Sequence, residues 1–144
     1  MKDTVVLISC TKKKQPLACE AEMMYSPSSL FSKALCYAKQ HLKPDHIFIL
    51  SAKYGLLPLD QVIEPYEKTL NNLSSIERKQ WAKIVNEQLA KLPLKKAIFL
   101  AGSKYREDLI PILESLGIEC EVPLKGLGIG EQLGYYTREL KGFE

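Results

Sequence analysis

The sequence predicts an α/β fold, a three-layer sandwich of helices around a four-stranded, mainly parallel sheet. Short apolar runs rich in β-branched residues alternate along the chain with longer segments of helical periodicity. A helical segment separates each run from the next, which is the spacing that parallel strands with crossover helices require. The first run is apolar at nearly every position, so its strand is expected to be buried on both faces.

Four apolar runs are expected to be the strands. The first, TVVLIS, has no charged residue and is rich in β-branched side chains, as is typical of a buried strand. The later runs HIFIL, KAIFL and IECEV are shorter. The expected strands are residues 4–9, 46–50, 96–100 and 118–122.

Four longer segments are expected to be helices. Residues 26–29 (SPSS) supply a hydroxyl N-cap and a proline near the first turn of one helix. Residues 74–77 (SSIE) have the S-x-x-E pattern of a capping box, and Gly117 is placed to end a later helix. The helix after the capping box is expected to bury Trp81, Ile84, Val85 and Leu89. The expected helices are residues 28–41, 75–92, 104–116 and 131–140.

The remaining segments are expected to be loops. Residues 10–26 are polar and lysine-rich, with one helical turn predicted over 18–24. Residues 51–69 form a long irregular segment that contains enough leucine, valine and tyrosine to pack against the domain. Residues 123–130 (PLKGLGIG) are a glycine-rich loop before the last helix.

Size and composition indicate one globular domain over residues 1–144. Hydrophobic residues make up 46% of the chain and charged residues 26%, which is an ordinary balance for a domain with its own core. No apolar run approaches the roughly 20 residues of a membrane helix, and the amino-terminal run lacks the pattern of a signal peptide. We therefore expect a cytoplasmic protein with no membrane partner. The net charge of +3 permits an anionic partner without requiring one.

The cysteines and histidines do not predict a metal centre or any other cofactor. The four cysteines show no C-x-x-C spacing and are expected to be free thiols in a reducing compartment. Cys10 and Cys19 together with His41 and His46 fit no common zinc pattern.

Three of the expected strands end in unusual residues. The segments SCTK (9–12), SAKYG (51–55) and AGSKY (101–105) each combine a small hydroxyl residue with a lysine. The carboxyl ends of parallel strands lie on one edge of a sheet, so these hydroxyls, backbone N–H groups and ammonium groups are expected to meet there. This chemistry is suited to a phosphate, a nucleobase or another planar polar anion. The alternative is that these are ordinary turn residues with solvated lysines.

The glycine-rich loop is a weaker candidate. GLGIG (126–130) offers a backbone nest for an anion next to a helix start. It is G-x-G-x-G and not G-x-G-x-x-G, and it follows no long strand, so it does not predict a dinucleotide site.

Several individual residues have two possible roles. Lys53 is either a cation or proton donor at the site, or the partner of Asp60 or Glu67 in a salt bridge. Asp60 and Glu67 are either a general acid and base or braces for their loop. Cys10 follows a strand and precedes lysines, a setting that depresses a thiol pKa, but no histidine partner for a nucleophile is evident.

The tyrosines divide in the same way. Tyr25, Tyr54, Tyr66 and Tyr105 are expected either to stack on a base or to pack in the core with their hydroxyls bonded.

The central segment SAKYGLLPLDQVIEPYE resembles the central motif of the YaaA family of bacterial peroxide-stress proteins. LISCTKKK is similar to the start of that family, and FLAGSKYRE to a later segment, in the same order along the chain. The arrangement of LISCTKKK, MYSPSSLFSKA and AKYGLL looks closer still to a group of short bacterial and phage proteins of unknown function. The cysteine-to-lysine start also resembles the core domain of archaeosine synthase, which acts on a deazaguanine base in tRNA.

The YaaA resemblance implies DNA binding and protection under oxidative stress, and the archaeosine synthase resemblance implies nucleobase chemistry. The family positions correspond to Ser9, Lys12 or Lys13, Tyr54, Gly55, Asp60, Tyr66, Glu67, Ser103 and Tyr105. This chain departs from the family at two of its positions: Cys10 stands where the family has proline, and Glu67 where it has arginine. The chain is also much shorter than the YaaA proteins, so the regions that those proteins add around the core are missing.

We therefore expect a protein that binds a nucleotide, a nucleobase or a nucleic-acid segment, and that acts on the base or its glycosidic bond. The alternatives are a non-catalytic DNA-binding stress protein and a structural partner-binding domain. In the leading hypothesis Lys12, Lys13, Lys53 and Lys104 face phosphate, and Asp60 or Glu67 moves a proton. The expected catalytic residues are Asp60, Glu67 and Lys53. The expected ligand-binding residues are Ser9, Cys10, Lys12, Lys13, Tyr25, Ser51, Tyr54, Gly55, Tyr66, Ser103 and Tyr105.

Overall fold

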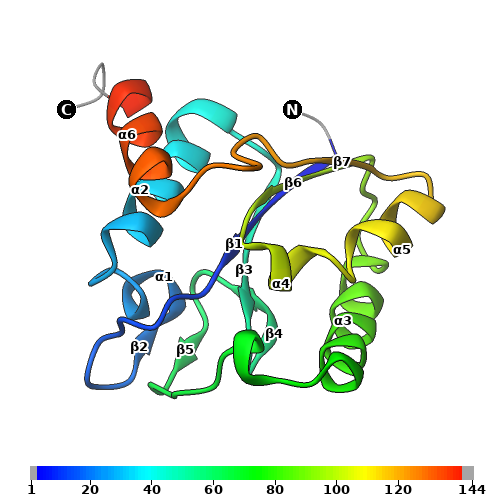
Figure 1. The fold of residues 1–144 in the computed structure, drawn as a ribbon, viewed down its shortest axis with the longest axis horizontal. Coiled ribbons are helices and arrows are strands. Elements are labelled where there is room, and N and C mark those ends of the chain that lie inside the picture. The colour runs from blue at the N-terminus through cyan, green and yellow to red at the C-terminus, as the bar shows by residue number, and fades with distance from the viewer. Residues whose placement is uncertain (1–2, 141–144) are drawn as a thin grey trace.

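The computed structural model describes residues 3–140 and has a mixed α/β fold, as predicted. Helices cover both faces of a central sheet (Figure 1). One face carries α2 (Ser29–Tyr37), the π-helical turn η1 (Ala38–Leu42) and α6 (Ile129–Leu140). The other face carries α3 (Ser75–Leu89), α4 (Ser103–Arg106) and α5 (Ile110–Ser115).

The sheet has five strands in the order β4-β3-β1-β6-β7. Four of them are parallel: β1 (Thr4–Ser9), β3 (His46–Ser51), β6 (Lys96–Leu100) and β7 (Glu119–Glu121). The central strand β1 pairs with β3 on one side and β6 on the other, and its apolar side chains are buried. These four strands are those expected from the apolar runs.

The prediction of four strands was wrong by one, because β4 (Gly55–Pro58) adds an antiparallel edge. The chain reverses after Ser51, and Gly55 pairs with Ser51 across a short connection. Gly55 has a φ of 71°, in the left-handed region that glycine adopts without strain. Leu56 and Leu57 then pack into the core, so a segment expected to be irregular begins with a short strand.

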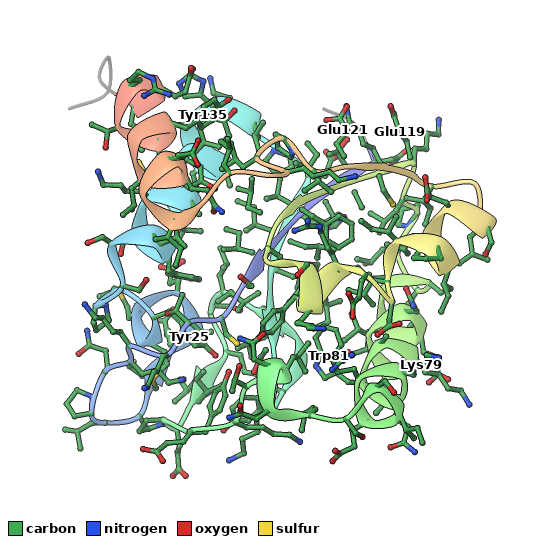
Figure 2. All side chains as sticks on the ribbon, in the orientation of Figure 1. Tyr25, Lys79, Trp81, Glu119, Glu121 and Tyr135 are labelled. Atoms are coloured by element: carbon green, nitrogen blue, oxygen red, sulfur yellow. The ribbon has the colours of Figure 1, made fainter. Side chains whose placement is uncertain are left out.

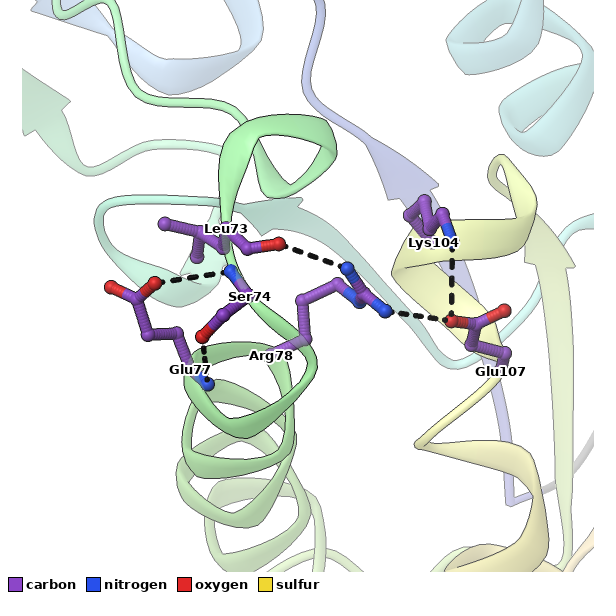
Figure 3. A network of polar contacts seen from close by, with 6 residues as sticks. All are labelled: Leu73, Ser74, Glu77, Arg78, Lys104 and Glu107. Atoms are coloured by element: carbon purple, nitrogen blue, oxygen red, sulfur yellow. Dashed lines mark hydrogen bonds and ion pairs between the residues drawn. The ribbon is translucent and has the colours of Figure 1, made fainter.

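The helix starts follow the predicted caps. The Ser28 hydroxyl accepts a hydrogen bond from the N–H of Phe31 at the start of α2. Ser74 and Glu77 form the predicted capping box at the start of α3, which Figure 3 shows. Gly117 follows α5 with a φ of 82°, as expected of a residue that ends a helix.

Two helix predictions need correction. The segment 104–116 is not one helix but two, α4 and α5, because Pro111 has no N–H to donate and its ring clashes with the carbonyl of residue 107. Ile84 was expected in the core but is 56% exposed. It lies about 100° around α3 from Val85, outside the face that packs on the sheet.

A small second layer of structure lies beside the main sheet. The two-residue strands β2 (Cys19–Glu20) and β5 (Val62–Ile63) pair antiparallel. The short helix α1 (Ala21–Met24) follows β2 within the predicted turn, and the 3₁₀ turn η2 (Leu70–Asn72) precedes α3. No helix within residues 3–140 has the length and apolar character needed to cross a membrane.

Candidate functional site

The ends of β1, β3 and β6 lie on one edge of the sheet, as the sequence predicts. The N–H of Cys10 donates to the carbonyl of Leu50 at 3.0 Å, which extends the pairing of β1 and β3 to this edge. From β1 the chain crosses over one face to β3, whereas from β6 it continues over the other face to β7 (Figure 1). The two connections diverge between β1 and β6, and ligands of open α/β sheets bind at such a switch point.

A cavity of about 330 Å³, here called the switch-point cavity, lies at the ends of β1 and β6. Its apolar wall comes from α2 and α6 and includes Phe31 and Tyr136. Its polar lining residues include Ser9, Ser103 and Gln132. The cavity therefore combines an apolar wall with a few hydrogen-bonding groups, the usual composition of a small-molecule site.

A second cavity of about 680 Å³, here called the lysine cavity, adjoins the first. Lys12, Lys14 and Lys68 line it, and Glu67 is the carboxylate in its lining. The two cavities share four lining residues: Cys10, Thr11, Asn71 and Tyr105. A molecule with an apolar planar part and an anionic part can thus contact both cavities at once.

Cys10 and Tyr105 form the shared wall. The thiol sulfur lies 3.3 Å from the Tyr105 hydroxyl, and both side chains are buried. The N–H of Leu70 donates to the same hydroxyl at 3.5 Å. Burial raises the pKa of Tyr105, so its hydroxyl is neutral at physiological pH and keeps its proton.

A chain of three hydroxyls lies beside the lysine cavity. The Tyr66 hydroxyl oxygen is 2.6 Å from that of Tyr25 and 2.7 Å from the Ser51 hydroxyl. The Ser51 hydroxyl also accepts from the N–H of Tyr54 at 3.0 Å. Burial raises the pKa of Tyr25 to about 12 and raises that of Tyr66 as well, so both phenols are neutral. The chain connects Ser51, at the end of β3, to Tyr66, which lines the lysine cavity, and through it to Tyr25.

Ser51 is held from both faces of the sheet. Its hydroxyl contacts Tyr66, and its carbonyl accepts a hydrogen bond from the indole N–H of Trp81 at 2.9 Å. Figure 2 shows Tyr25 and Trp81 on opposite sides of the sheet near this edge. The Trp81 ring packs edge-on against Tyr105, with 5.9 Å between ring centroids. Trp81 therefore contacts the wall that both cavities share.

Lys14 is a site residue that the sequence interpretation did not select. Its ammonium nitrogen lies 4.6 Å from the centroid of the Tyr66 ring, within the range of a cation–π contact. It also donates to the carbonyl of Lys12 at 3.3 Å. Burial lowers the pKa of Lys14, and attraction to Cys10 and Glu67 opposes that effect. No signal in the run Lys12-Lys13-Lys14 distinguishes the lysine that is held against the protein from its exposed neighbours.

The predicted phosphate-facing lysines do not lie together. Lys12 lines the lysine cavity, whereas Lys13 is exposed and lines neither cavity. Lys53 lies 5.3 Å from the Tyr54 ring centroid, in the lining of a separate cavity of about 280 Å³ that also includes Gly55. Within residues 3–140 Lys53 makes no ion pair with either predicted carboxylate.

Lys104 lies in the switch-point cavity but is partly engaged by the protein. Its ammonium group is 3.8 Å from Glu107, which also lies 3.5 Å from the guanidinium of Arg78 (Figure 3). Arg78 in turn donates to the carbonyl of Leu73 at 2.9 Å. This network joins the start of α3 to α4 and so fixes the position of Ser103 and Tyr105.

The two predicted proton-transfer carboxylates are placed differently. Glu67 is exposed and lines the lysine cavity. Asp60 is exposed in the turn between β4 and β5, and lines neither of the two adjoining cavities. Within residues 3–140 no group of three or more His, Cys, Asp or Glu side chains is arranged to hold a metal ion.

The fold is that of an α/β protein with two adjoining cavities at the carboxyl edge of its sheet. The chain belongs to DUF6884, a family of unknown function, whose sequence model matches residues 5–138. No curated protein and no solved structure matches the chain. The resemblances to YaaA and archaeosine synthase therefore remain predictions.

Proposed function

We propose that the protein binds a nucleotide, with the base in the switch-point cavity and the phosphate in the lysine cavity. The observation that carries the proposal is the shared wall at Cys10 and Tyr105, which places a cavity with an apolar wall beside a cavity lined by three lysines. A nucleotide has the same division between a planar base and an anionic phosphate. The sugar would lie beside the shared wall.

The switch-point cavity suits a base. Its volume is at the lower end of the range of small-molecule sites, which start at about 300 Å³. Aromatic and aliphatic side chains of α2 and α6 supply surfaces for a ring face. The hydroxyls of Ser9 and Ser103 and the amide of Gln132 supply hydrogen bonds for a ring edge.

The lysine cavity suits a phosphate. Lys12, Lys14 and Lys68 outnumber the carboxylate of Glu67 in its lining. Lys14 is held in place by its contacts with the Tyr66 ring and the Lys12 carbonyl, so binding would cost less side-chain entropy there than at a freely rotating lysine. Glu67 is the carboxylate placed to move a proton at the sugar or phosphate if the ligand is also processed.

The test is titration with nucleoside monophosphates, in which binding is measured by calorimetry and by the fluorescence of Trp81. Trp81 is the only tryptophan of the chain and packs against Tyr105, so occupancy of either cavity is expected to change its emission. We expect saturable binding that weakens as salt is added, because the phosphate contact is ionic.

The matched variants are Lys14→Ala and Lys91→Ala. Lys14→Ala is expected to weaken binding about tenfold, the effect of losing one charge-assisted hydrogen bond. Lys91 is exposed just beyond α3, before β6 begins at the opposite edge of the sheet, so Lys91→Ala should bind like the wild type. Absence of saturable binding by both methods for every nucleotide, or equal effects of the two variants, would contradict the proposal.

A further inference from the structure

Gln132 is the residue with an amide side chain on the face of α6 that lines the switch-point cavity. Ile129, Gln132 and Tyr136 are spaced by three and four residues, so their side chains lie on one face of the helix. The first and last are apolar or aromatic, and Gln132 alone of the three carries an amide. It also lines the neighbouring cavity beside residues 124–127, so it lies where these two cavities meet.

The amide of Gln132 has a fixed orientation. Its Nε2 donates to the carbonyl of Leu127 at 2.9 Å, and the N–H of Leu127 donates to the carbonyl of Leu124 at 3.1 Å. Rotating the amide by 180° would place its oxygen against the Leu127 carbonyl, and two acceptors repel. Within residues 3–140 the amide oxygen of Gln132 accepts no hydrogen bond. The side chain therefore has an acceptor oxygen and a second N–H available for a ligand, and the bond to Leu127 fixes the positions of both.

We infer that Gln132 selects bases that carry an exocyclic amino group next to a ring nitrogen, as adenine and cytosine do. This inference rests on the proposed function, because it assigns the base edge within the same cavity. The amino group donates to the Gln132 oxygen, and the ring nitrogen accepts the remaining N–H. Glutamine pairs in this two-bond manner with the amino edge of adenine in nucleic-acid recognition.

The experiment compares ligands that differ by the amino group alone. The pairs are adenosine monophosphate with purine riboside monophosphate, and cytidine monophosphate with 2-pyrimidinone riboside monophosphate. We expect the wild type to bind the amino member of at least one pair about tenfold more tightly, since its partner leaves the Gln132 oxygen without a donor. Gln132→Leu should reduce that preference to about twofold or less, with little change for the ligand that lacks the amino group.

Gln40→Leu is the matched control. Gln40 is exposed in η1, which precedes β3 at the opposite edge of the sheet, and this variant should keep the wild-type preference. A thermal melt of each variant shows whether the fold is retained.

The possible failures are distinguishable. If the wild type binds nucleotides but both members of every pair equally, or if Gln132→Leu keeps the preference, the inference about Gln132 is wrong and nucleotide binding stands. If the wild type binds no nucleotide, both the proposed function and the inference are wrong.

Discussion

The Tyr66 hydroxyl links two buried groups, so Tyr66→Phe is expected to destabilise the fold. Its oxygen lies within 2.7 Å of both the Ser51 hydroxyl and the Tyr25 hydroxyl, whose residues are inaccessible to solvent. The substitution keeps the ring and removes the oxygen that connects them. Ser51 retains the N–H of Tyr54, whereas Tyr25 loses the hydroxyl that lies 2.6 Å away.

The magnitude follows from the desolvation of the group that loses its partner. A buried polar group without its hydrogen bond costs about 1–3 kcal/mol, so we expect the free energy of unfolding to fall by about 2 kcal/mol. For a chain of this length the corresponding decrease in Tm is roughly 4–8 °C.

The assay is urea denaturation of wild type, Tyr66→Phe and Tyr54→Phe. Tyr54 is the matched control, because its ring packs edge-on against Tyr66 but its hydroxyl makes no hydrogen bond within residues 3–140. Tyr54→Phe should change the free energy of unfolding by less than about 0.5 kcal/mol. A loss of less than 0.5 kcal/mol for Tyr66→Phe, or equal losses for the two variants, would refute the argued role of the hydroxyl chain.

Three further predictions concern pH, the β3–β4 turn and the carboxylates. Folding raises the pKa of Tyr25 from about 10 to about 12, so the stability that its neutral hydroxyl contributes should be present below pH 10 and lost as pH rises through 12. Urea denaturation at stepped pH should show that the free energy of unfolding falls less steeply with pH in Tyr25→Phe than in the wild type. Equal pH slopes for the two proteins would contradict this. Gly55→Ala should lower the free energy of unfolding by about 1–2 kcal/mol, since φ is 71° and the new Cβ would lie 3.0 Å from the Gln88 amide oxygen; a neutral effect in the same denaturation assay would show that the turn relaxes. If the ligand is processed, Glu67→Gln should slow the release of free base, measured by chromatography, while Asp60→Asn should not. The reason is that Glu67, unlike Asp60, lines the lysine cavity. A slower release in Asp60→Asn alone would reassign the proton transfer to Asp60.

The centre of the sheet could be predicted from the sequence because β1 and β6 are almost entirely buried and therefore apolar. A run such as TVVLIS is apolar and rich in β-branched residues, so its local composition favours a buried strand. The edge strand β4 could not be predicted in the same way. It has only four residues and ends in Pro58. It forms because the chain reverses before Gly55 and because Leu56 and Leu57 pack in the core. Pro111 lies inside the segment predicted as one helix, and the break that accompanies it is encoded by that single residue.

The candidate site was predictable at the level of strand ends but not at the level of individual side chains. A parallel sheet brings Ser9 and Ser103 to one edge whatever the strand order. Gln132 joins them because β1 and β6 are neighbours in the sheet and α6 lines the cavity at their ends. This placement depends on the strand order, which no local sequence pattern encodes. The contact between Cys10 and Tyr105 likewise joins residues that are far apart in the chain.

The central position of β1 also has a consequence for how the chain folds during synthesis. β1 leaves the ribosome before both of its partners, since β3 and β6 begin only at His46 and Lys96. Until β6 has emerged, one edge of the most apolar strand is unpaired and open to other chains. Such distant pairings slow folding, and half-made chains are exposed to aggregation in the meantime. The nascent chain is therefore expected to depend on chaperones until β6 has emerged and paired with β1.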